Sequence, residues 1–150
     1  MPVVNEALDA AAKIPGTSDA YTKAEMTDAI TELFRKRDPS AVLPMLRDDF
    51  VLKVPTTLPY GGQFTGAGAF ARFFTGTPGG SDVWESFTVH LDDIIEAGAY
   101  LIARLTNIAV PKKTGQAVVF QNLWLFEVAD GKFTRAQLYA DTAAIQPTAG

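Results

Sequence analysis

The polar residues best placed for chemistry lie on two predicted strands, over residues 99–110 and 116–128. Arg104 and Thr106 lie two residues apart on the first strand, and Asn122 and Trp124 lie two apart on the second. Side chains two apart on a strand point to the same face, so each pair can face one pocket. A guanidinium, a hydroxyl, an amide and an indole N–H can together hold and polarise an oxygen of a bound molecule.

His90 is the single imidazole of the chain, and an imidazole can move a proton near neutral pH. We therefore take Arg104 and His90 as candidate catalytic residues. Each also has a structural interpretation. Arg104 can pair with a carboxylate on a neighbouring strand, because long charged side chains are rarely buried unpaired. His90 comes just before Asp92 and Asp93, so it can equally lie at an acidic, solvent-exposed strand end.

Apolar residues of the same predicted strands supply the walls of the pocket. Val54 ends the first strand, Leu138 lies in the last, and Tyr60 lies in a Pro/Gly-rich loop at the expected mouth. Apolar walls with a few placed polar groups are typical of ligand sites. Trp124 can also be an ordinary core residue. The residues that we expect to bind a ligand are Val54, Tyr60, Thr106, Asn122, Trp124 and Leu138.

Helix signals precede strand signals along the chain. Thr22-Lys23-Ala24-Glu25 reads as a capping box and predicts a helix over residues 22–37. Asp38-Pro39 predicts a second, short or kinked helix that contains Pro44, and a third is expected over 66–75. The expected strands cover 50–54, 84–95, 99–110, 116–128 and 133–142, and residues 55–66 are expected to form a loop. This order predicts an α+β fold, with about three N-terminal helices packed on a curved, mostly antiparallel β-sheet.

The domain organisation follows from the same pattern. We expect a weakly ordered leader over residues 1–20 with a short helix over 8–14, a single domain over 21–145, and a frayed tail over 146–150. The outer side of the sheet, where Tyr139 and Asp141 are expected, has to be covered. We therefore expect a homodimer that forms through the sheet.

Composition excludes several classes of protein. The 150 residues include no cysteine and one histidine, which excludes disulfides, thiolate zinc sites and multi-histidine metal sites. The net charge is −4 and the 13 Lys and Arg are scattered, so nucleic acid and anionic membranes are poor partners. With no basic leader and no apolar run of about 20 residues, we expect a soluble cytoplasmic protein. From the predicted apolar pocket we expect its partner to be a small hydrophobic molecule, bound without a cofactor.

Three stretches of the chain resemble the nuclear transport factor 2-like superfamily. They are Arg35-Lys36-Arg37-Asp38-Pro39 with Arg47 to Pro55, Gly61 to Phe74, and Thr114 to Gln116 with Phe126 to Phe133 and Tyr139 to Asp141. The superfamily includes ketosteroid isomerases, limonene epoxide hydrolases and SnoaL-like polyketide cyclases. The resemblance implies a cone-shaped fold around a pocket, which hosts many unrelated activities.

The family's catalytic residues are mostly replaced in this chain. Where ketosteroid isomerase has its base, its phenol and its second acid, this chain has Val54, Ile30 and Trp124. Arg104 matches the arginine of limonene epoxide hydrolase, but Thr106 and Leu138 stand where its carboxylates would be. The resemblance therefore argues against both reactions.

Three hypotheses follow from these replacements. The first is a cofactor-independent cyclase or isomerase, of the SnoaL-like type, that acts on a hydrophobic oxygenated substrate. The second is a non-catalytic protein that binds an apolar ligand in the same cone. The third is a protein-interaction module whose cone is filled by its own side chains.

Overall fold

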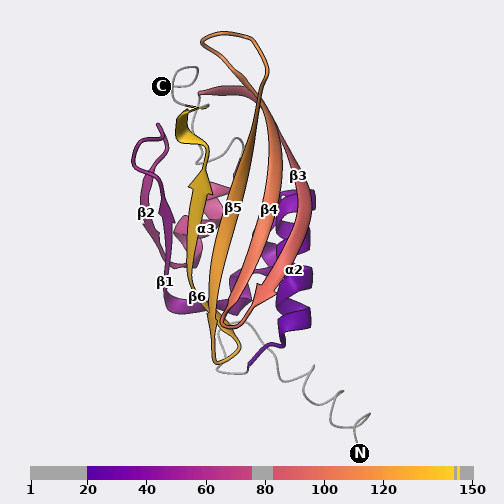
Figure 1. Ribbon diagram of the computed structural model, residues 1–150. Helices are drawn as coiled ribbons and strands as arrows, with labels where there is room; N and C mark the ends of the chain where they lie inside the picture. The colour runs from indigo at the N-terminus through magenta and orange to yellow at the C-terminus, as the bar shows by residue number, and fades with distance from the viewer. Residues whose placement is uncertain (1–19, 76–82, 144, 146–150) are drawn as a thin grey trace, which may run out of the picture.

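The computed structural model describes residues 20–75, 83–143 and 145, and shows helices packed on one face of a long curved sheet (Figure 1). In chain order the elements are α2 (Lys23–Lys36), two 3-10 turns (Pro39–Ala41 and Leu43–Met45), β1 (Leu46–Val54), β2 (Gly62–Thr65), α3 (Gly66–Phe73), β3 (Trp84–Ala97), β4 (Tyr100–Pro111), β5 (Val118–Ala129) and β6 (Lys132–Ala140).

The six strands form one mixed sheet in the order β2-β1-β6-β5-β4-β3. Strands β3 to β6 form an antiparallel meander, and β1 pairs in parallel with β6 and antiparallel with β2. The parallel pair of β1 and β6 joins the first part of the sheet to the last, so strands that are distant in sequence enclose the same core. The α+β class and the curved, mostly antiparallel sheet agree with the prediction from sequence.

Helix α2 begins as its capping box predicts. The Thr22 hydroxyl accepts a hydrogen bond from the Glu25 N–H at 3.1 Å, and the Glu25 carboxylate accepts one from the Thr22 N–H at 2.8 Å. The helix ends at Arg37, whose backbone is left-handed with φ 53° and ψ 40°. The face that packs against the sheet consists of Met26, Ala29, Ile30, Leu33 and Phe34.

The structure corrects two local predictions. Residues 62–65, expected within a loop, form the short edge strand β2, and a four-residue strand is too short to leave a clear periodic signal. The expected helix after Asp38 is two single 3-10 turns instead. Pro44 lacks the N–H that a longer helix would need, and the chain turns directly into β1. The expected helix over 8–14 lies outside the described residues.

The two faces of the sheet have different compositions. The face towards the helices carries the buried side chains, whereas the opposite face is partly exposed. Alternation along β4 makes the pattern clear, since its odd-numbered residues from 101 to 109 are buried and most of its even-numbered ones are exposed or half-buried. Within the described part of the chain, no helix is both long enough and apolar enough to span a membrane.

Candidate functional site

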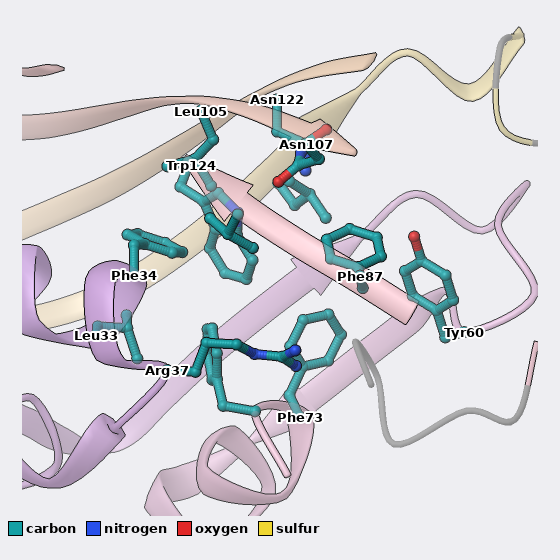
Figure 2. A pocket seen from close by; sticks show the side chains of 13 residues that line it. Leu33, Phe34, Arg37, Tyr60, Phe73, Phe87, Leu105, Asn107, Asn122 and Trp124 are labelled. Carbon is teal, nitrogen blue, oxygen red and sulfur yellow. The ribbon is translucent and has the colours of Figure 1, made fainter. Parts of the chain in front are cut away.

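A cavity lies between the sheet and the two helices (Figure 2). Its volume is about 40 Å³, measured as the space that the centre of a water molecule can occupy. That is enough for water or a thin ligand group, so the interior is not completely filled by its own side chains. The cavity is lined by Leu33, Phe34, Arg37, Tyr60, Phe73, Phe74, Phe87, Val89, Leu105, Asn107, Asn122, Trp124 and Leu138.

The walls of this cavity are largely aromatic. The Trp124 ring is buried at the centre of β5, with its centroid 5.4 Å from that of Phe34, 5.5 Å from Phe74 and 5.8 Å from Phe73. These contacts join the sheet to both helices. Tilted and edge-on ring pairs at such distances hold one another in fixed orientations. The cavity therefore has a preorganised aromatic wall that suits the flat face of a ring-containing ligand.

Tyr60 closes one side of the cavity from the loop that joins β1 to β2. The loop is tight: the Leu58 N–H donates to the Pro55 carbonyl at 3.1 Å, and the Gly61 N–H donates to the Leu58 carbonyl at 3.0 Å. A Cβ at Gly61 would lie 1.9 Å from the Pro55 oxygen, so only glycine fits there. Burial raises the pKa of the Tyr60 phenol, and the neighbouring Trp84 side chain opposes this only in part.

Two asparagines place amide groups in this apolar interior. Asn107 of β4 is completely buried, and neither its Nδ2 nor its Oδ1 has a hydrogen-bond partner within the described protein. Asn122 of the neighbouring strand β5 is 8% exposed, and its Oδ1 also has no partner. A buried polar atom without a hydrogen bond costs about 1–3 kcal/mol. Three such atoms lie at this one cavity, and a ligand or water bound there would supply the missing hydrogen bonds.

Arg37 adds a cation to the rim. It follows the last turn of α2, and Figure 2 shows its guanidinium turned towards the cavity near Phe73. The side chain is half-buried, and this burial lowers the pKa of its guanidinium. An arginine in a protein nevertheless stays protonated at neutral pH. Of the described lining residues, Arg37 is the one that carries a charge, and the lining contains no carboxylate or imidazole.

The structure corrects the predicted orientation of β4. Arg104 lies on the outer face, where its side chain is half-exposed and its Nε is 3.1 Å from an Asp93 oxygen. Thr106 is also on that face, and its hydroxyl donates to Asp92 at 2.7 Å. The resemblance to epoxide hydrolase placed Arg104 inside. The opposite alternation buries Leu105 and Asn107 and leaves the charged residue in water, which avoids the desolvation of an arginine.

His90 likewise lies on the outer face, and its side chain is 77% exposed. Its Nε2 is 3.6 Å from an Asp92 oxygen, so it belongs to the exposed polar cluster around Thr106. This placement agrees with the structural interpretation of His90 and puts both candidate catalytic residues outside the cavity.

Four of the predicted ligand-binding residues do line the cavity: Tyr60, Asn122, Trp124 and Leu138. Val54 is buried and points inward from β1, but it lies beside a separate, open depression near Gln63 and Gln137. A role in binding stays a prediction for all of them.

The sequence analysis missed Asn107, Arg37 and the phenylalanines of the wall. A signal for Asn107 was present, because the alternation that buries it also exposes Arg104, and a charged residue inside a strand favours the solvent side. Arg37 had no comparable signal, since a residue at a helix end can point in many directions.

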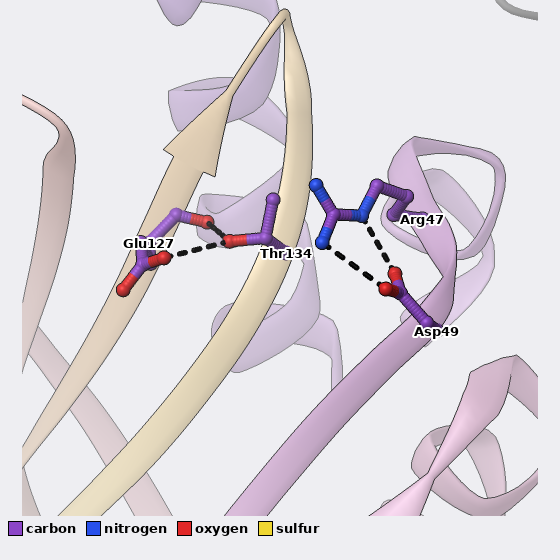
Figure 3. Close-up of polar contacts among 4 residues, drawn as sticks. All are labelled: Arg47, Asp49, Glu127 and Thr134. Atoms are coloured by element: carbon purple, nitrogen blue, oxygen red, sulfur yellow. Dashed lines mark hydrogen bonds and ion pairs between the residues drawn. The ribbon is translucent and has the colours of Figure 1, made fainter.

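Other polar side chains of the sheet form hydrogen bonds or ion pairs with one another. Figure 3 shows two of them: Arg47 pairs with Asp49 at 2.6 Å, and the Thr134 hydroxyl contacts the side chain of Glu127 at 3.2 Å and its carbonyl at 3.3 Å. The Arg47 guanidinium lowers the pKa of the Asp49 carboxyl. No group of three or more histidine, aspartate or glutamate side chains in the described ranges could hold a metal ion.

Comparison with known proteins identifies the family. The model of the SnoaL-like domain matches residues 27–136. No curated protein matches the chain in sequence.

Solved structures agree on the fold. A protein of unknown function from Burkholderia pseudomallei, described as NTF2-like, has a TM-score of 0.69 and 19% identity, over 84% of this chain and 95% of that one. TerC, co-crystallised with polyporic acid, has a TM-score of 0.67 and 21% identity, over 83% and 95%. A Catenulispora acidiphila protein with a ketosteroid isomerase-like fold, in complex with trimethylamine, has a TM-score of 0.64 and 15% identity, over 86% and 95%. The family match covers most of the chain and all but one of the cavity-lining residues, so the chain belongs to the SnoaL-like domain family and has the fold of NTF2-like proteins.

Proposed function

We propose that this protein binds a planar, oxygenated aromatic small molecule in the cavity between its sheet and helices. The observation that carries the proposal is the pair Asn107 and Asn122, which place three buried amide atoms without a partner in the described protein inside an aromatic enclosure. A ligand with a carbonyl and a hydroxyl or N–H group would satisfy a donor and an acceptor there. Its rings would pack against Trp124 and the phenylalanines.

The energetics support a ligand of this kind. Buried amide groups without partners destabilise the empty protein, and a ligand that supplies both kinds of bond recovers this free energy on binding. Water molecules that fit the space can bond to the amides in the meantime. A ligand then exchanges water contacts for its own and adds apolar contact with the aromatic wall.

The composition of the cavity supports binding ahead of proton transfer. General acids and bases work best when their pKa lies near the working pH. Among the described lining residues the titratable groups are Tyr60, whose pKa burial raises, and Arg37, which stays charged. Neither is suited to exchange protons near neutrality.

Cofactor-independent cyclase or isomerase chemistry is the second candidate function. The Asn107 amide favours it, because an N–H aimed at a substrate carbonyl stabilises the negative charge that enolisation develops on that oxygen. The co-crystallisation of TerC with polyporic acid supports a small-molecule role for proteins of this fold.

The test is to identify what the purified protein carries. We would record native mass spectra and analyse solvent extracts of the wild type, of an Asn107→Leu/Asn122→Leu double variant, and of a Gln121→Leu control on the outer face. An aromatic oxygenated compound that is retained by the wild type and control and lost from the double variant supports the proposal. A compound retained equally by all three overturns it. Turnover of the recovered compound would then support catalysis over simple binding.

We also propose that two copies associate through the outer face of the sheet. Among the described residues, six large apolar side chains are exposed, all on outward-facing positions of β3 to β6: Ile95, Tyr100, Ile108, Val119, Leu123 and Tyr139. Concentrations of exposed apolar residues on one surface are typical of interaction sites. The face is also self-complementary in charge, since it carries Arg104 and Arg135 together with Asp93 and Glu127.

A further inference from the structure

Asn107 presents a whole amide group to the cavity without a partner. Its side chain is completely buried, and neither its donor nitrogen nor its acceptor oxygen has a hydrogen-bond partner in the described protein. The donor and the acceptor of an asparagine lie side by side in one plane. A bound group that offers an acceptor and a donor in the same arrangement would therefore form two hydrogen bonds with this residue at once.

Asn122 lies diagonally across from Asn107 on the neighbouring strand. Asn107 pairs with Phe120 and Asn122 pairs with Leu105, so the two asparagines share the inner face two residues out of register. Diagonal neighbours of this kind are about 7–8 Å apart, and Figure 2 shows both at the same end of the cavity. The Oδ1 of Asn122 also lacks a partner in the described protein, so one small ligand can contact both residues.

The chemistry of the two asparagines favours a neutral ligand with a donor. A carboxylate, a ketone or an ether offers only acceptors, so it would leave the oxygens of Asn107 and Asn122 without a hydrogen bond. A carboxylate would also lose its hydration, and Arg37, the charged residue of the described lining, already interacts within the protein. The neighbouring N–H and C=O of a lactam, or of another cis amide, match Asn107 without a charge.

The volume of the cavity limits the ligand to about one ring. The cavity measures about 40 Å³, and one water molecule requires about 10–15 Å³ in this measure, so about three water molecules fit. Three water molecules occupy about 90 Å³ in the liquid, which is about the size of one six-membered ring. A flat ring of that size can place its polar edge on Asn107 and its face against the Trp124 wall.

We propose that the ligand is a neutral single-ring lactam, or another cis amide of this size. Its N–H donates to the Oδ1 of Asn107, and its carbonyl accepts from the Nδ2 of the same residue. A hydroxyl or amino group elsewhere on the ring would donate to Asn122. This proposal rests on the proposed binding function and adds to it the polar edge, the charge and the size of the ligand.

The test compares 2-pyridone with 2-pyrone. Both are planar six-membered rings with one carbonyl, and they differ at one ring position, where the lactam has N–H and the lactone has oxygen. Their dissociation constants are measured by nitrogen-edited NMR titration, because the backbone signals that shift also show whether a probe occupies the cavity. The proteins are the wild type, Asn107→Leu, and Gln121→Leu as a matched control on the outer face of β5. Asn107→Leu removes two buried atoms without partners, so it should fold at least as well as the wild type.

We expect the wild type and Gln121→Leu to bind 2-pyridone about tenfold or more tightly than 2-pyrone, because the lactone lacks the donor and sets an oxygen against the Asn107 oxygen. In Asn107→Leu the affinity for 2-pyridone should fall at least to the wild-type value for 2-pyrone. If both probes bind the wild-type cavity equally, or if Asn107→Leu keeps the preference, the inference about the lactam edge is wrong and the binding function stands. If neither probe shifts the signals of the cavity, the proposed binding function is overturned as well.

Discussion

The two faces of strands β4 and β5 differ in whether their polar side chains have hydrogen-bond partners. On the outer face, Arg104 pairs with Asp93 and Thr106 donates to Asp92, so these polar groups have partners and also remain in contact with water. On the inner face of the same strands, both amide atoms of Asn107 and the Oδ1 of Asn122 are buried without a hydrogen-bond partner in the described protein. Polar side chains with hydrogen-bond partners stabilise the sheet, whereas buried polar atoms without partners indicate a place where a ligand or water can bind.

The first prediction concerns packing on the two faces. Trp124→Ala should lower the free energy of unfolding by about 3–5 kcal/mol, because it removes the ring that joins the sheet to both helices. Gln121→Ala, on the outer face of the same strand, should change it by less than about 0.5 kcal/mol. Urea denaturation measures both. Equal losses would show that the outer face is as tightly packed as the inner one.

The second prediction concerns association through the outer face. Leu123→Lys should weaken the proposed homodimer about tenfold or more, because it places a desolvated charge at the centre of an apolar contact. Sedimentation equilibrium over a range of concentrations measures the dimer dissociation constant. Lys53→Gln, on the outer face of β1, is the control. A wild type that stays monomeric at high concentration would contradict the proposal.

The third prediction concerns the unpartnered amide. Asn107→Leu should raise the free energy of unfolding by about 1 kcal/mol and abolish ligand binding, because it removes two buried atoms that lack hydrogen bonds. Thr106→Val, the neighbouring change on the outer face, should leave binding intact. Thermal unfolding and calorimetric titration check the pair. A destabilised Asn107→Leu protein would indicate that the amide already has a structural partner.

The smallest effect is expected from pH. Burial raises the pKa of Tyr60, so its phenol stays protonated beyond the usual titration near pH 10, and Arg37 keeps its proton. The affinity for a neutral ligand should therefore be constant from about pH 5 to about pH 8. A raised pKa in the folded state means that stability is full below the unfolded value of about 10 and falls as the pH rises above it. A change in affinity within this range would show that another titratable group contacts the ligand.

Several features of this fold could be predicted from residues near one another in sequence. The capping box at Thr22 fixed the start of α2 because its hydrogen bonds join residues only three apart. Asp130-Gly131 predicted the last hairpin because both residues adopt the positive φ values that its turn requires. The edge strand β2 was missed because it is short and stabilised by pairing with β1, which no local pattern reveals.

The site was predicted only in part, and β4 shows why. Its two alternating sets of residues, Leu101 to Ala109 and Ile102 to Val110, are both largely apolar, so the hydrophobic pattern alone does not decide which set is buried. The likeness to a family arginine favoured the wrong set. Pairing decides it, because Ala103 lies opposite Trp124 and both must share the inner face.

The sequence by itself determined α2, α3 and the order of the long strands β1 and β3 to β6, and it placed Asn122 and Trp124 on one face of β5. These features depend on local hydrogen bonds and on alternation within single strands. Only the tertiary structure decided that Asn107 and Arg37 belong to the cavity and that Arg104 and His90 do not. Membership of a cavity depends on strand register and on how helix ends pack against the sheet. Those contacts join residues far apart in the chain, so local patterns do not encode them individually.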